Sequence, residues 1–284
     1  MKVISISAEK SQSEATCHKC RGADGRRVKA RKDIIISAGA VGSPQLLQLS
    51  GVGPASSLTR HSIPVVLELP AIGQILLEHF AFFQVSKLRN SERRLSLGHL
   101  SPSDPAFFKL MSVDWISNEA LPTETLKKTL TEDGYLSDVE RLDEAGRMHV
   151  ETIILYNPLA PGVPVDGLAV LVNSARRLLQ CFTWTEIQDF VETEVSPAPG
   201  LEPLTVESSD KGIEDQIRVV GNPHFHMAGT CAMRKVLDTN LRVKGIRRLR
   251  VVDVSIFPAH WGGHPHALLH TIADLTAEFI AEGE

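Results

Sequence analysis

The chain has 284 residues, of which 43% are hydrophobic, and a formal net charge of −4. This is the composition of a globular protein with one large or two modest domains. There is no basic excess to indicate nucleic-acid binding, and no apolar run is long enough to span a bilayer. Residues 1–7 lack the apolar core of a signal peptide, so the compartment is unknown, with the cytoplasm as the default.

Taken in chain order, the first strong pattern is a strand followed by a helix. Residues 33–39 contain three consecutive isoleucines, which is typical of a fully buried parallel strand. A helix is predicted from residue 44 to residue 49, with Ser43 as its N-cap and Pro44 in the favoured first position.

The middle of the chain gives weaker patterns. Apolar periodicity predicts helices at residues 107–116, 123–130, 168–179 and 210–219, and alternation predicts a strand at residues 149–156. A proline-rich connector precedes the last of these helices. The predicted elements therefore mix helices with strands.

Histidines are concentrated near the C-terminus, where six of the eleven lie between His224 and His270. That density is typical of a site that moves protons or holds a metal. Alternate residues of an extended segment point the same way, so we expect His224 and His226 to share a face.

Two predicted elements accompany these histidines. Residues 249–252 are predicted to form a buried strand that ends in polar residues, the usual place for a cofactor in an open α/β sheet. A glycine-rich turn leads into a helix predicted at residues 267–280, whose first N–H groups can face an acceptor. A metal site is the alternative, because His260, His264 and His266 are closely spaced. No H-E-x-x-H motif or carboxylate partner accompanies them, so we expect no metal.

Several motifs, in the right order, resemble the glucose–methanol–choline (GMC) family of flavin oxidoreductases. One is the run G-A-V-G-S-P-Q-L-L-Q-L-S-G-V-G-P at residues 39–54. A second is H-M-A-G-T-C at residues 226–231. A third is L-R-V-V-D-V-S-I-F-P at residues 249–258, followed by His264 before the predicted helix.

The resemblance implies an α/β fold of mixed (α+β) type. Segments of a FAD-binding domain at residues 1–80 and 216–284 would flank a substrate-binding domain at residues 81–215. That domain is expected to be a shortened antiparallel sheet, because the family's Arg-Gly-Ser strand and Pro-Ile-Asp-Pro segment are not found in it.

The implied activity is FAD-dependent oxidation of the CH–OH group of a small-molecule alcohol, by an alcohol oxidase or dehydrogenase. An imidazole accepts the hydroxyl proton while the flavin takes the hydride. By the resemblance His226 would be the base, and His264 would hydrogen-bond the same oxygen. Four further residues would lie against the ribityl and isoalloxazine portions of FAD: Asp253, Val254, Pro265 and His266.

The chain departs from the family pattern in two places. Where the family has V-G-x-N-L-x-D-H, Ile75 replaces the Asn and Glu78 replaces the Asp, while His79 is kept. The G-x-G-x-x-G turn that would hold the ADP half of FAD does not occur in the sequence.

These departures predict a truncated copy, inactive alone unless a partner supplies the nucleotide-binding segment. Two alternatives stay open. One is a flavin-fold protein without redox activity, with a binding, partner or lyase-like role. The other is a zinc protein that uses the histidine cluster.

Overall fold

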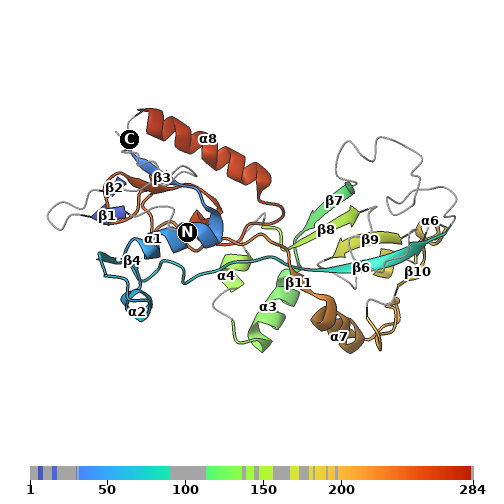
Figure 1. Cartoon of the computed structure of the whole chain (residues 1–284). Coiled ribbons are helices and arrows are strands. Elements are labelled where there is room, and N and C mark those ends of the chain that lie inside the picture. The colour runs from blue at the N-terminus through green and yellow to red at the C-terminus, as the bar shows by residue number, and fades with distance from the viewer. Residues whose placement is uncertain are drawn as a thin grey trace. The chain divides into compact units, whose positions relative to one another are not determined.

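The computed structural model describes residues 6–8, 15–17, 30, 32–89, 113–135, 139–143, 147–155, 167–172, 179–181, 183–189, 191–195 and 198–282. The chain divides into two compact units. Unit 1 comprises residues 1–79, 224–260 and 264–284, and unit 2 comprises residues 80–223 and 261–263. Figure 1 labels most of their helices and strands.

Unit 1 contains short parallel strand pairs. β3 (Ile34–Ile36) pairs with β12 (Leu249–Val251), and β4 (Val52–Gly53) pairs with β5 (Leu67–Glu68), both in parallel. β1 (Ile6–Ala8) and β2 (Ala15–Cys17) form an antiparallel pair. The β3–β12 pair joins segments that lie more than two hundred residues apart in the sequence.

The core of unit 1 is apolar and draws on both of these distant segments. Its buried residues are Ile34, Ile36, Leu47, Val52, Ile72, Cys231, Val236, Leu237, Leu241, Val243, Ile246, Leu249, Val251 and Ile256. Ile35, between two of them, is 46% exposed, so the prediction of a fully buried strand was wrong. Successive side chains of a strand point to opposite faces, and the face of Ile35 lies away from this core.

The helices of unit 1 are α1 (Gly39–Leu49), α2 (Ala55–Arg60), the short 3₁₀ helix η4 (Val254–Ile256) and α8 (His266–Glu282). The prediction for α1 was wrong at its start. The helix begins at Gly39, so Ser43 is not its N-cap and Pro44 lies inside it.

A hydrogen bond from a distant segment explains how α1 accommodates its proline. Pro44 has no N–H to give to the carbonyl of Ala40, four residues before it. The hydroxyl of Thr230 donates to that carbonyl instead, at 2.6 Å. Both residues are buried. The second motif of the sequence therefore completes the helix formed by the first.

Unit 2 is built on an antiparallel sheet. Its strand order is β10 (Val191–Glu194), β6 (Phe80–Leu88), β9 (Gly167–Val172), β8 (Val150–Leu155) and β7 (Val113–Glu119), and β11 (Asn222–Pro223) also pairs with β6. The predicted strand at residues 149–156 is confirmed as β8.

Two predicted helices of unit 2 were wrong in their described parts. Residues 113–116 belong to strand β7, and residues 168–172 belong to strand β9. The rest of those predictions, residues 107–112 and 173–178, lies outside the described residues. Leu179, the last residue of the second predicted helix, lies in a helical stretch described at residues 179–181. A short apolar run fits a helix or a buried strand equally well, and here pairing with β6 and β8 decides for the strand.

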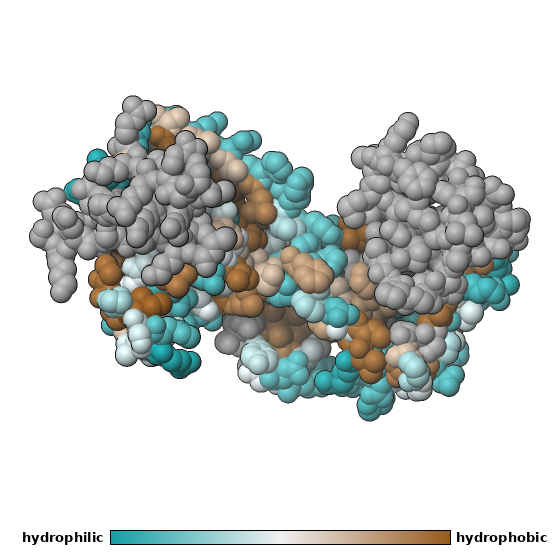
Figure 2. Space-filling model, in the orientation of Figure 1, coloured by the Kyte–Doolittle hydropathy of each residue, from teal (hydrophilic) through white to brown (hydrophobic). Residues whose placement is uncertain are grey.

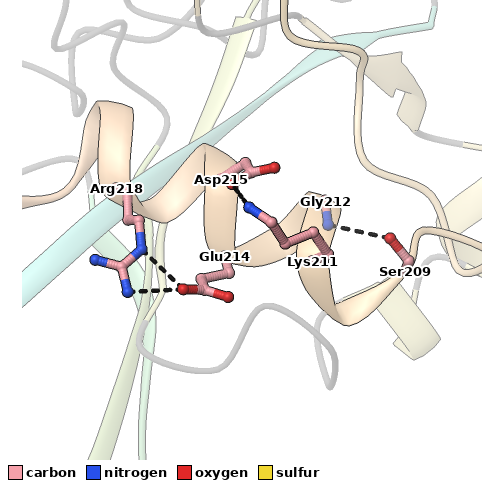
Figure 3. Close-up of polar contacts among 6 residues, drawn as sticks. All are labelled: Ser209, Lys211, Gly212, Glu214, Asp215 and Arg218. Atoms are coloured by element: carbon pink, nitrogen blue, oxygen red, sulfur yellow. Dashed lines mark hydrogen bonds and ion pairs between the residues drawn. The ribbon is translucent and has the colours of Figure 1, made fainter.

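The described helices of unit 2 include α3 (Thr123–Glu132), α4 (Val139–Leu142), α6 (Thr185–Gln188) and α7 (Asp210–Val220), so the predictions at 123–130 and 210–219 are confirmed. The side chain of Ser209 caps α7 by accepting from Gly212 N at 3.1 Å. Two ion pairs at i, i+4 spacing lie along its exposed side, Lys211–Asp215 and Glu214–Arg218 (Figure 3). These local contacts account for a helix in a segment that is rich in charge.

The surface of α8 is mixed in character. Leu268 and Leu275 are 38% and 46% exposed, and Thr276 is the buried residue of the helix. Brown, apolar residues accordingly reach the surface where Figure 1 draws α8 (Figure 2). None of the helices in the described ranges combines the length and apolar character that a bilayer crossing needs.

Candidate active site

Five histidines of unit 1 gather in one cluster: His79, His224, His226, His260 and His264. His226 is at its centre, because its ring centroid lies 4.5 Å from His224, 4.7 Å from His264 and 5.1 Å from His79. These three contacts are edge-to-face, whereas His79 stacks on His260 at 4.3 Å. The two residues predicted as base and hydrogen-bond partner, His226 and His264, are thus brought together.

The backbone around His226 is fixed by the segment that ends at His79. Leu77 and Ala228 exchange two backbone hydrogen bonds of 3.0 and 2.9 Å, and His224 N donates to the carbonyl of His79 at 2.8 Å. The ring nitrogens Nδ1 of His79 and His226 lie 2.9 Å apart, within hydrogen-bonding distance. His79 therefore orients the imidazole of His226.

Glu78 has a role that the sequence did not reveal. Its Oε1 accepts from the backbone N–H of His226 at 2.7 Å and from that of His79 at 2.8 Å. The carboxylate thus ties together the two segments that supply the central histidines. The sequence showed only that Glu78 replaces an Asp, and the clamp depends on a segment about 150 residues away.

Phe225 separates His224 from His226 and determines how they meet. Its φ angle of 60° lies in the left-handed region, and the residue is 82% exposed. The segment therefore bends at Phe225 instead of continuing as the extended chain that we expected. The two rings still face one another, in edge-to-face contact at 4.5 Å.

The cluster changes the acid–base properties of its central residue. Burial, followed by the electrostatic effect of His224, His264, His79 and His260, lowers the pKa of His226 to about 4. The imidazole is therefore neutral at physiological pH and has a nitrogen lone pair available. Burial likewise raises the pKa of Cys231 to about 12, so this thiol of the second motif stays protonated and serves in packing.

The predicted flavin-contact residues lie in two places. Asp253 precedes η4, and its Oδ2 accepts from Gly39 N at 2.9 Å and from the hydroxyl of Ser43. Its Oδ1 accepts from Ser255 N at 2.8 Å. Asp253 therefore fixes Val254 and η4 against the start of α1.

Pro265 and His266 are at the start of α8, whose first N–H groups have no partner within the helix. His266 Nε2 lies 3.3 Å from His270 Nε2, so these two exposed rings form a pair of their own. The metal alternative from the sequence named His260, His264 and His266. Among the described residues, the structure instead groups the ligand nitrogen of His264 with those of His224 and His226.

The residues present fit the ring end of a flavin. Parallel strands β3 and β12 end near Gly39 and Asp253, the edge at which open α/β sheets bind ligands. A Cβ built on Gly39 would meet nothing within 4 Å, so the chain leaves open space there. The start of α8 supplies N–H donors for an acceptor such as a flavin carbonyl.

Comparison with known proteins gives a consistent result. Two family models, both described as GMC oxidoreductase, match residues 1–81 and 146–273. The GMC-type oxidoreductase acuG of Aspergillus aculeatus is 28% identical over 303 residues, which cover 90% of this chain and 58% of that protein. The choline oxidase of Arthrobacter globiformis is 27% identical over 275 residues, covering 89% of this chain and 49% of that protein.

The fold is similar to that of solved structures. A formate oxidase from Aspergillus oryzae RIB40 matches with a TM-score of 0.77 and 20% identity, over 98% of this chain and 59% of that chain. The present chain thus spans about half the length of the curated relatives that it matches.

Proposed function

The chain belongs to the GMC oxidoreductase family, and on that premise we propose that its histidine cluster handles the proton in FAD-dependent oxidation of a small alcohol. The observation that supports this proposal is the contact between His226 and His264, whose ring centroids lie 4.7 Å apart. Each comes from a different motif of the sequence, and the fold places them at one point.

Oxidation of a CH–OH group to a carbonyl removes a proton from oxygen and a hydride from carbon. FAD, when bound, supplies the hydride acceptor. His226 supplies the proton acceptor in this proposal. Its lowered pKa of about 4 keeps the imidazole neutral, so a lone pair is available at any pH well above that value.

The contact with His79 decides which nitrogen of His226 meets the substrate. Because Nδ1 of His226 lies 2.9 Å from Nδ1 of His79, Nε2 is the nitrogen left for the alcohol. A hydrogen bond at one ring nitrogen fixes the tautomer and the ring plane. His79 is therefore a positioning residue, and His264, which is exposed, donates to the alcohol oxygen.

The proposal assigns the ring end of FAD to residues of unit 1. Asp253, Val254, Pro265 and His266 would lie along the ribityl and isoalloxazine portions. The pyrophosphate end would be held by a G-x-G-x-x-G turn, which these 284 residues do not contain. Tight binding of FAD would then need a further nucleotide-binding segment, either from a longer form of this protein or from a partner.

Small alcohols are the proposed substrate class, because choline, the substrate that names one relative, is itself an alcohol. The test is the rate at which alcohols bleach the flavin absorbance without oxygen, in chain reconstituted with FAD. His226→Ala should slow this reduction by about a hundredfold or more, as loss of a general base does. His61→Ala, which removes an exposed histidine that follows α2, is the control and should leave the rate unchanged.

Two results would speak against the proposal. An unchanged rate in His226→Ala would remove this residue from proton transfer. A folded chain that binds FAD but is not reduced by any alcohol would indicate the flavin-fold protein without redox activity.

A further inference from the structure

Three histidines of the cluster bring ring nitrogens close together. In His224, His226 and His264 one nitrogen each lies within 4.8 Å of the others. The three rings are nearly perpendicular to one another, with interplanar angles of 78° to 89°. No pair of them stacks, so each ring can turn an edge toward the same point.

These separations are close to what a metal ion needs. Zinc binds imidazole nitrogen at about 2.0–2.1 Å in tetrahedral geometry, which puts two ligand nitrogens about 3.3 Å apart. Nitrogens already within 4.8 Å reach that spacing through small side-chain rotations. Three imidazoles are a donor set suited to zinc, copper and nickel.

The surrounding contacts hold two of the three ligands in place. The backbone N–H of His226 donates to Glu78 Oε1. The ring Nδ1 of His226 lies 2.9 Å from Nδ1 of His79, which leaves the ring Nε2 for an ion. His224 is held by its backbone N–H, which donates to the carbonyl of His79. The contact at Nδ1 of His226 matches the usual arrangement of metal-binding histidines, in which the second ring nitrogen is hydrogen-bonded.

The third ligand gives access to the site. His264 is exposed, whereas His224 and His226 are half-buried, so an ion from solvent would meet His264 first. The group of ligand atoms that lie within 4.8 Å of one another does not include Glu78. The fourth position would be filled by water.

We propose that His224, His226 and His264 bind one divalent transition-metal ion of the zinc class, and that the bound ion blocks proton transfer at His226. A nitrogen lone pair that coordinates a metal is not available to accept a proton. Binding of the ion stands on the geometry alone, whereas blocking of proton transfer rests on the function proposed above. His224 is the residue that separates the two roles, because it belongs to the metal group but neither accepts the proton nor hydrogen-bonds the alcohol in the proposed reaction.

The test is a titration of the purified 284-residue chain with zinc chloride, without flavin or alcohol, followed by calorimetry and equilibrium dialysis. We expect one ion per chain. His224→Ala should weaken the affinity by about a hundredfold or more, since loss of even an outer-shell partner costs about 10–100-fold. His270→Ala is the control and should bind zinc as the wild type does, because His270 pairs with His266 on α8.

Several outcomes would overturn the inference. They are the lack of stoichiometric binding, unchanged affinity in His224→Ala, and loss of binding in His270→Ala, which would assign the ion to α8. Circular dichroism shows whether His224→Ala is folded. If it is not, His264→Ala gives the same test at an exposed position, where loss of the ring leaves no cavity.

A second measurement addresses the blocking of proton transfer. In FAD-loaded protein, zinc should inhibit alcohol oxidation, and His224→Ala should need about a hundredfold more zinc for half inhibition of its own metal-free rate. Zinc that binds without inhibiting would overturn this part. If the chain oxidises no alcohol, the proposed function fails, but the flavin-free titration still decides whether the metal site exists.

Discussion

Replacing Thr230 by valine tests whether its hydroxyl completes α1. Thr230 Oγ1 donates to the carbonyl of Ala40 at 2.6 Å, in the turn where Pro44 has no N–H to offer. Thr230 and Ala40 are only 4% and 5% exposed, so water cannot take the place of the hydroxyl in the variant.

The expected cost follows from the carbonyl that loses its donor. A buried polar group left unsatisfied costs about 1–3 kcal/mol, and valine fills nearly the same volume as threonine, so no cavity adds to this. We therefore expect Thr230→Val to lower the free energy of unfolding by about 1–2 kcal/mol. In a Pro44→Ala background the new N–H can donate to the same carbonyl, so the cost of Thr230→Val should fall by about 1 kcal/mol.

Urea denaturation of the wild type, both single variants and the double variant gives the coupling energy directly. The control is Thr276→Val in α8, where the buried hydroxyl donates to Ile272 O at 2.7 Å within its own helix. That control should show no coupling to Pro44→Ala. A coupling between Thr230 and Pro44 within about 0.3 kcal/mol of zero would refute the reasoning, since independent sites add within that margin.

Two further predictions concern a buried carboxyl group and a glycine. Burial raises the pKa of Glu194, so above pH 4.5 the native state keeps a proton that the unfolded state has lost. The free energy of unfolding of the wild type should therefore fall as the pH rises through this window. Urea midpoints from pH 4.5 to 7 should show that fall, and Glu194→Gln should flatten it; parallel curves for the two proteins would contradict the assignment. Gly229→Ala should cost about 2 kcal/mol or more, because a residue with φ of 83° costs about 1–2 kcal/mol by itself and the added Cβ would lie 2.9 Å from Leu77 Cδ1. Gly39→Ala, with φ of 78° and nothing within 4 Å of its Cβ, is the matched control in the same unit, and equal costs in the two variants would rule out the steric contribution.

Sequence patterns predicted those parts of the molecule in which the determinants are local. Apolar periodicity predicted the helix at residues 210–219, and the contacts that favour it in the structure are local: the Ser209 cap and two ion pairs at i, i+4 spacing. The motifs placed His226 and His264 in one site, and the structure has their rings in contact. Local chemistry and motif order were sufficient in both cases.

Other features depend on residues that are distant in the sequence. The run at residues 168–172 is apolar enough for a helix, and its strand conformation comes from pairing with β6 and β8. His224 lay outside every motif, yet the bend at Phe225 turns its ring toward His226 and His264. A sequence pattern does not contain such contacts, because they exist only after the distant segments have come together.

The two groups of motifs are parts of one junction, which explains why they occur together. Gly39 and Ser43 of the first motif bond to Asp253, and the carbonyl of Ala40 bonds to Thr230. These residues contribute structure and no proton chemistry, although they belong to the signature of an oxidoreductase. Loss of either motif would leave buried polar groups of the other without partners, at a cost of about 1–3 kcal/mol for each group. The junction therefore supports the histidine cluster by holding in place the segments that position it. The coupling energy between Thr230→Val and Pro44→Ala measures how strongly the two motifs support each other at this junction.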